Sequence, residues 1–213
     1  MSRIRYFHKK FIEWRGEIKE HWFLITISLF IILIAVGIDY ASGFYVTYKA
    51  QVVNVPDLIL DHFGPYNLNI LFVYWWLLAL FVLIFYPLLY EVKKFHYVIF
   101  QFSFLIILRS IFIILTHLQT PSDAVGGLFP GVLNLLRFSN DQFFSGHVAL
   151  PFLGFLLFKN NKRLRYFFLI TSIAMGIIVL AMHLHYSIDV FAAYFITYGC
   201  YKSGEWFLKK LKL

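Results

Sequence analysis

Long apolar stretches, separated by short polar segments, dominate the chain from residue 22 onward. A helix that crosses the hydrocarbon core of a bilayer needs about 20 mostly apolar residues. Six stretches reach or approach this length, at residues 22–38, 68–90, 95–118, 143–158, 166–182 and 187–208. The pattern therefore predicts an all-α fold, a polytopic bundle of six transmembrane helices.

The composition supports a membrane protein. Hydrophobic residues make up 61% of the 213 residues and charged residues only 14%, whereas soluble domains carry about 25% charged residues. The lipid bilayer is therefore an expected partner, and we expect an integral, multi-pass membrane protein. No small-residue cleavage site follows the first apolar stretch, so we interpret that stretch as a retained helix and not as a signal peptide.

The distribution of Lys and Arg predicts the orientation. If the N-terminus is cytoplasmic, every alternate loop is basic, and the 19 Lys and Arg residues all lie on the cytoplasmic side except Lys49, Arg109 and Arg137. This bias favours cytoplasmic N- and C-termini. The net charge of +8 is then explained by topology and by contact with anionic lipids, and we expect no nucleic-acid partner.

Residues 1–21 form a basic segment whose apolar residues recur at helical spacing: Ile4, Phe7, Phe11, Trp14 and Ile18. Two interpretations have equal support, a helix that lies on the inner leaflet or a basic flank that only fixes the topology. A single membrane domain is predicted at residues 22–213, with its catalytic core at about 105–195. In the predicted loop at 39–67, Asn54–Asp57 has the pattern of a helix start.

Ionisable residues gather where three predicted helices approach the non-cytoplasmic face. Arg109 lies in the outer half of the third helix, Asp141 and His147 at the start of the fourth, and His185 and Asp189 at the start of the sixth. Charged groups inside a bilayer are costly, so they usually face the bundle interior and mark a functional site.

Two short motifs indicate what this site does. His185 and Asp189 are four residues apart, so on a helix the carboxylate can orient the imidazole, although a purely structural ion pair has the same spacing. Ser145-Gly146-His147 combines a hydroxyl donor, close backbone approach and a general acid at a helix N-terminus, where anions bind.

These motifs resemble the type 2 phosphatidic acid phosphatase superfamily of membrane phosphoesterases, and most of all its sphingomyelin synthase branch. The resemblance rests on Asp141-Gln-Phe-Phe-Ser145-Gly-His147, on His185-Tyr-Ser-Ile-Asp189-Val-Phe-Ala-Ala-Tyr194, on Arg109 with Thr116 and Leu118, and on Pro56-Asp57. The phosphatase branch has a K-x-x-x-x-x-x-R-P segment that this chain lacks, and an Arg where this chain has Val179. The synthase pattern differs at Asn140 and Val148.

The resemblance implies a phosphotransferase or phosphatase that acts without a metal or another cofactor, on the non-cytoplasmic side. His185 would be the nucleophile, Asp189 would orient it, and His147 would be the general acid and base. The resemblance also implies a set of residues that bind the phosphate or the substrate: Arg109, Asp141, Ser145, Gly146 and Tyr186. An acid near a helix start could equally well only fix the loop, so this alternative stays open for Asp141.

Three functions remain open at this stage. The first is a lipid phosphotransferase that moves a phospho-head-group from a phospholipid donor to a lipid acceptor. The second is a lipid phosphate phosphatase, in which water is the acceptor. The third is a non-catalytic membrane protein that only binds lipid.

Overall fold

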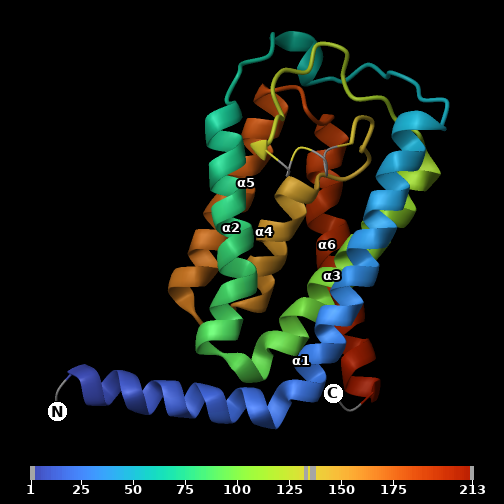
Figure 1. Cartoon of the computed structure of the whole chain (residues 1–213). Helices are drawn as coiled ribbons and strands as arrows, with labels where there is room; N and C mark the ends of the chain where they lie inside the picture. The colour runs from blue at the N-terminus through green and yellow to red at the C-terminus, as the bar shows by residue number, and fades with distance from the viewer. Residues whose placement is uncertain (1–2, 132–133, 135–137, 212–213) are drawn as a thin grey trace.

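The computed structural model describes residues 3–131, 134 and 138–211, and every regular element in this part of the chain is helical (Figure 1). The elements are α1 (Arg3–Tyr48), η1 (Leu60–His62), α2 (Asn69–Tyr90), α3 (Val92–Thr116), α4 (Gly146–Leu157), α5 (Lys162–Ala181) and α6 (Ser187–Leu211). A lone bridge pairs Val53 with Leu118. The all-helical prediction is confirmed for the described residues.

Four of the helices are long and apolar enough to cross a membrane: α1, α2, α3 and α5. Together they fit a multi-pass membrane protein. The helices α4 and α6 do not meet the same criteria of length and apolarity, so the count of six spans stays a prediction.

The first predicted span is too short at its C-terminal end. It was expected to stop at Ile38, but α1 continues to Tyr48 and runs along α3. The physical reason is that Asp39 lies within the helix and has partners on α3. Its carboxylate accepts a hydrogen bond from Ser110 at 3.2 Å and lies 3.4 Å from the Arg109 guanidinium. The paired charge lets the helix pass through Asp39.

The N-terminal part of α1 runs across the base of the bundle before the helix turns upward beside α3 (Figure 1). Trp14 Nε1 donates to the carbonyl of Leu88 at 2.9 Å, and Lys93 pairs with Glu17 at 3.3 Å. These contacts fix the segment beneath the connection from α2 to α3. The side chains of Ile4 and Phe7, part of the predicted apolar stripe, lie outside the described residues.

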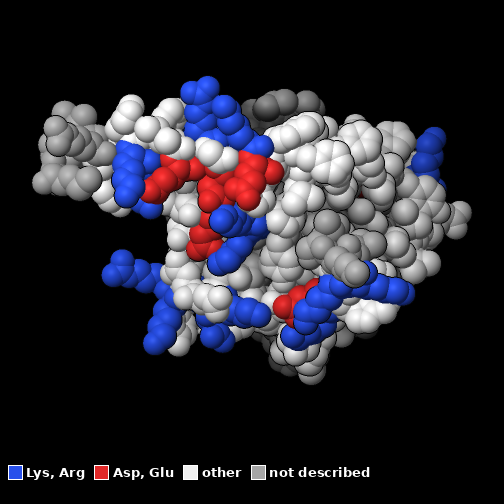
Figure 2. All heavy atoms as spheres, turned by 90° about the horizontal axis from the view of Figure 1, so that it is seen from below, with Lys and Arg blue, Asp and Glu red and all other residues white. Residues whose placement is uncertain are grey.

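Lys and Arg side chains are spread over the base of the bundle, around an acidic group next to the N-terminal segment (Figure 2). Several form ion pairs there, as in Lys94 with Glu91 and Lys202 with Glu205. Both termini lie at this end (Figure 1). The side of the membrane that it faces stays a prediction from the charge distribution.

Helix α4 is shorter than predicted. It has 12 residues, about 18 Å at 1.5 Å per residue, and cannot cross a core of about 30 Å. It packs against α2, α3, α5 and α6, and the irregular segment 138–145 leads down to its start. Irregular backbone at membrane depth requires surrounding protein or a cavity. Here the neighbouring helices surround α4, and its first residue, Gly146, lines a cavity inside the bundle.

Small residues set the closest helix contacts. A Cβ atom at Gly154 of α4 would lie 2.5 Å from Phe168 Cδ1 of α5, and one at Gly43 of α1 would overlap the ring of Phe138 in the segment before α4. Close approach of this kind replaces the hydrophobic effect as the source of helix association in lipid.

The loop between α1 and α2 ties itself to the start of α6. Asp57 Oδ2 accepts from the Ser187 N–H at 2.7 Å, and Asn54 Oδ1 accepts from the Tyr186 hydroxyl at 2.6 Å. The helix start predicted at Asn54–Asp57 leads into the short 3-10 helix η1, and the Asp57 carboxylate accepts the N–H groups of Ile59 and Leu60 at the beginning of that helix.

We expect Gly154→Ala to destabilise the protein by about 1–3 kcal/mol, because the added methyl group overpacks the contact with Phe168. Gly37→Ala is the control, since a Cβ atom there meets nothing within 4 Å and removing glycine from a helix favours folding. The unfolding temperature measured in detergent should fall for Gly154→Ala only. Equal unfolding temperatures for the two variants would contradict this packing.

Asp57→Ala should cost about 1–3 kcal/mol of stability at neutral pH, because three backbone N–H groups lose their acceptor. Burial raises the pKa of Asp57, but hydrogen bonds from Leu60, Ser187 and Ile59 outweigh burial, and the pKa falls below its ordinary value. The stabilisation is therefore complete above the unfolded-state pKa of about 3.9 and is lost as the pH falls below it.

Thermal unfolding of wild type, Asp57→Asn and Asp57→Ala at pH 7 and at acid pH tests this. The Asn variant keeps one acceptor oxygen and should fall between the other two at pH 7. The wild type and the Ala variant should converge in acid. A constant difference at both pH values would show that the carboxylate charge contributes nothing.

Candidate active site

A cavity of about 330 Å³ lies between α2, α3 and α4, beneath the loops at the end of the bundle opposite the termini. Its polar lining comes from five elements or loops and includes Asp39, Arg109, Asp141, His147 and His185. Its apolar lining includes Leu77, Leu80, Leu105, Ile106 and Leu150. The cavity thus joins a charged end to an apolar end that follows the helices.

His185 is held by Asp189. The imidazole Nδ1 lies 3.1 Å from Asp189 Oδ2, and the same oxygen accepts from the Tyr186 N–H at 3.1 Å. Asp189 is fully buried and His185 lines the cavity. A carboxylate on Nδ1 favours the tautomer in which Nδ1 carries the proton, which leaves a lone pair on Nε2. The geometry suits a nucleophile.

His147 lies across the cavity from His185. The two ring centroids are 6.0 Å apart. Aromatic rings surround His147, with Phe72 at 4.6 Å, Trp76 at 5.1 Å and Phe129 at 6.4 Å between centroids. The Nδ1 atom of His147 is buried without a hydrogen-bond partner among the described residues. One imidazole is therefore fixed by a carboxylate, and the other stands in an apolar setting.

The start of α4 lies directly beside the Arg109 guanidinium. A Cβ atom at Gly146 would lie 3.1 Å from Arg109 Nε, so glycine lets the helix start come close to the guanidinium. The Ser145 N–H donates to the carbonyl of Asp189 at 3.1 Å, which joins the start of α4 to α6. The Ser145 hydroxyl is buried and has no hydrogen-bond partner within the described part of the chain.

Each of the three guanidinium nitrogens of Arg109 lies near one oxygen atom. Its Nη2 lies 2.7 Å from Asp141 Oδ1, its Nη1 lies 3.4 Å from Asp39 Oδ1, and its Nε donates to the carbonyl of Phe144 at 3.3 Å. The side chain is buried within the bundle. A buried cation needs such partners, because removal from water is costly. Asp141 therefore pairs with Arg109 as well as lining the cavity.

The loop before α4 is pinned in an unusual conformation. Asn140 and Phe143 have φ angles of 62° and 104°, in a region that residues other than glycine seldom adopt. Asn140 and Thr120 exchange hydrogen bonds at 2.9 and 3.1 Å, and the Gln142 amide donates to the carbonyl of Leu184 at 3.2 Å. Backbone strain of this kind clusters at functional sites.

The structure brings together most of the residues predicted from the sequence. Arg109, Asp141, Gly146, His147 and His185 line the cavity. Asp189 and Ser145 are not part of the lining, but Asp189 contacts His185, and the Ser145 N–H donates to the Asp189 carbonyl.

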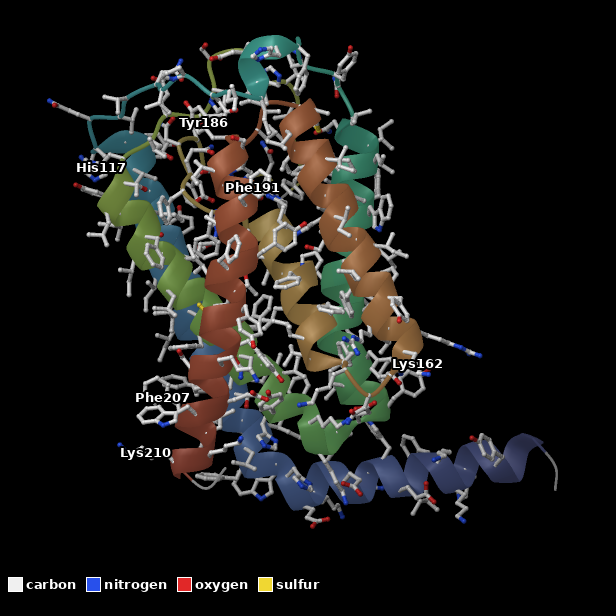
Figure 3. All side chains as sticks on the ribbon, turned by 180° about the vertical axis from the view of Figure 1, so that it is seen from behind. His117, Lys162, Tyr186, Phe191, Phe207 and Lys210 are labelled. Carbon is white, nitrogen blue, oxygen red and sulfur yellow. The ribbon has the colours of Figure 1, made fainter. Side chains whose placement is uncertain are left out.

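Tyr186 was predicted to bind substrate, but it is not part of the cavity lining. It stands at the loop end of α6 (Figure 3), and its hydroxyl is occupied by Asn54. The hydrogen bond to the first loop gives Tyr186 a position in the scaffold of the site.

Sequence reasoning missed Asp39, Trp76 and Phe129. Asp39 was placed in a loop, although its spacing of four from Gly43 and eight from Thr47 puts the three on one helix face. The aromatic residues carried no usable signal, since the chain contains 26 Phe and 5 Trp.

A metal-ligand arrangement occurs elsewhere in the described residues, at Glu17, Glu20 and His21 near the base of the bundle. It is far from the cavity along α1. The cavity residues were not found to form such a group within the described part of the chain.

Comparisons with known proteins show one similarity to a family, over part of the chain. Searches of the curated proteins and of the solved structures gave no match. The family model described as PAP2 superfamily C-terminal matches residues 139–205, which is less than half of the chain and includes the loop before α4, both histidines and Asp189. Residues 139–205 are therefore similar to the C-terminal region of proteins of the PAP2 superfamily.

Proposed function

We propose that the protein is a membrane-embedded lipid phosphotransferase, similar to sphingomyelin synthases, that moves a phospho-head-group between lipids through a phosphohistidine. One observation carries the proposal. His147 and His185 face one cavity with ring centroids 6.0 Å apart, and Asp189 holds His185. The family match supports the same chemical class.

The first step transfers the head group to the protein. His185 Nε2 attacks the phosphorus of a lipid phosphodiester, and the bond from phosphorus to the diacylglycerol oxygen breaks. His147 gives its proton to that leaving oxygen. Asp189 stabilises the positive charge that forms on the His185 ring, at an Nδ1–Oδ2 distance of 3.1 Å.

The second step regenerates the protein. The hydroxyl of an acceptor lipid gives its proton to His147 and attacks the phosphorus, and the bond to His185 breaks. Arg109 and the N–H groups at the start of α4 stabilise the phosphoryl oxygens in both steps. These side chains supply nucleophile, acid, base and charge stabilisation, so the proposed mechanism uses no metal or other cofactor.

The shape of the cavity suits a lipid. Its charged end holds the two histidines, and its apolar end is lined by side chains of α2, α3 and α4 such as Trp76, Phe102 and Leu150. A diacyl lipid can place its head group in the first part and its acyl chains along the second. From the Lys and Arg bias of the sequence, we propose that this end of the bundle faces the non-cytoplasmic side.

His185→Ala should abolish transfer, and His147→Ala should lower the rate by about 10²- to 10⁴-fold, the usual contribution of general acid–base catalysis. The control is His62→Ala, since His62 is exposed in η1. Purified protein is incubated with an isotope-labelled phospholipid and either ceramide or diacylglycerol, and the lipids are analysed by mass spectrometry.

Each product pattern has a definite meaning. A new labelled phospholipid supports the transferase. Free phosphate or a free phospho-head-group, without transfer, identifies the hydrolase instead. No product, or full turnover by His185→Ala, would contradict the proposed chemistry.

Phe129→Ala should raise the share of hydrolysis over transfer several-fold. The Phe129 ring packs on Trp76 at 5.7 Å and on Phe72 at 5.8 Å between centroids, above His147. Its removal admits water to the intermediate. Leu128→Ala is the matched control, because its side chain is 54% exposed and does not line the cavity. The ratio of free head group to transferred head group measures the effect, and an unchanged ratio in Phe129→Ala would refute this shielding.

A further inference from the structure

Asp39 is an acidic residue of the cavity that the proposed mechanism does not use. It comes from α1, a helix that otherwise lies at the edge of the bundle, with most of its apolar segment unburied. Its side chain is 38% exposed and lines the cavity, 3.4 Å from Arg109. Asp39 is therefore open to a substrate and close to the group that would bind phosphate.

Several contacts of α1 fix Asp39 in this place. One turn further along the helix, Gly43 meets the Phe138 ring, and after another turn the Thr47 hydroxyl donates to the carbonyl of Ser139 at 2.6 Å. Ser110 of α3 donates to Asp39 itself at 3.2 Å. The carboxylate is held by α3, and the helix that carries it is held by the segment that leads to Asp141.

The charges around Arg109 leave little positive potential for an anion. Among the described residues that line the cavity, Arg109 is the one Lys or Arg, and two carboxylates, Asp39 and Asp141, lie within 3.4 Å of it. A doubly charged phosphomonoester meets more repulsion from these carboxylates than a singly charged phosphodiester does. At an effective dielectric constant of about 20, one extra charge at about 7 Å changes affinity by roughly tenfold or more.

We propose that Asp39 is a specificity-determining residue, which cancels part of the charge of Arg109 and thereby selects singly charged phosphodiester lipids over doubly charged phosphomonoester lipids. The inference rests on the proposed function and deepens it. It gives a physical reason for a transferase to leave phosphomonoester lipids in the same membrane intact.

The test compares two lipids with identical acyl chains, phosphatidic acid as the monoester and phosphatidylcholine as the diester. Asp39→Asn should raise the ratio of kcat/KM for the monoester to that for the diester by about tenfold or more at pH 8. The gain should shrink at pH 5.5, because the second pKa of a phosphomonoester is about 6 and the monoester then carries one charge. The groups that face Asp39 across the cavity are Arg109, Asp141, His147 and His185. The wild type and Asp39→Asn share these groups, so the difference between the two proteins reports on Asp39.

Two control variants separate charge from shape. Asp39→Glu keeps the charge and should keep the wild-type ratio. Ser110→Ala removes the hydrogen bond to Asp39 and keeps every charge, so it should also keep the ratio. An unchanged ratio in Asp39→Asn, or an equal change in Asp39→Glu, would overturn the proposal.

A binding measurement keeps the proposal testable without turnover. Inorganic phosphate at pH 8 should raise the unfolding temperature of Asp39→Asn more than that of the wild type, because ligand binding stabilises the folded state. If phosphate stabilises both proteins equally, the role of Asp39 is refuted. If the wild type turns over neither lipid, the proposed function fails, and the phosphate comparison still decides the charge effect of Asp39.

Discussion

The buried guanidinium of Arg109 is the constraint on which the rest of the structure depends. A cation inside a bundle must be paired, and breaking such a pair costs about 3–5 kcal/mol. Arg109 contacts Asp39 of α1, Asp141 of the loop before α4, and the carbonyl of Phe144. These partners explain why α1 passes its predicted end and why the segment before α4 descends into the bundle. They also explain why α4 begins with a glycine, since a Cβ atom at Gly146 would press on the guanidinium.

The candidate catalytic groups are placed by the same arrangement. Once the start of α4 lies beside Arg109, His147 in its first turn faces the cavity, and the bond from the Ser145 N–H to the Asp189 carbonyl aligns α4 with α6. His185 is then opposite His147, with Asp189 behind it. One imidazole has a carboxylate partner and the other has aromatic neighbours, which is the asymmetry that a nucleophile and an acid–base group require.

Local sequence spacing predicted part of this structure, and distant contacts determined the rest. The spacing of four predicted that His185 and Asp189 pair, but only Asp189 lies in α6, and His185 stands in the turn before that helix. Apolar length predicted α2, α3 and α5 closely. The pairing of Asp39 with Arg109 joins positions 70 residues apart. A sequence read locally treats that acid as the end of a helix, so both the extension of α1 and a residue of the cavity were missed. The length of α4 was wrong for a similar reason, because the irregular segment before it is tolerated only inside the assembled bundle.

The most direct test of the central claim is chemical trapping of the intermediate. Purified protein is mixed with a phospholipid labelled in its phosphate, without an acceptor lipid, quenched with alkali, digested, and analysed by mass spectrometry. Two imidazoles that share one phosphorus predict an acid-labile, alkali-stable label on the peptide that contains His185, and no label in His185→Ala. A label on another residue, or a label that persists in His185→Ala, would contradict the account.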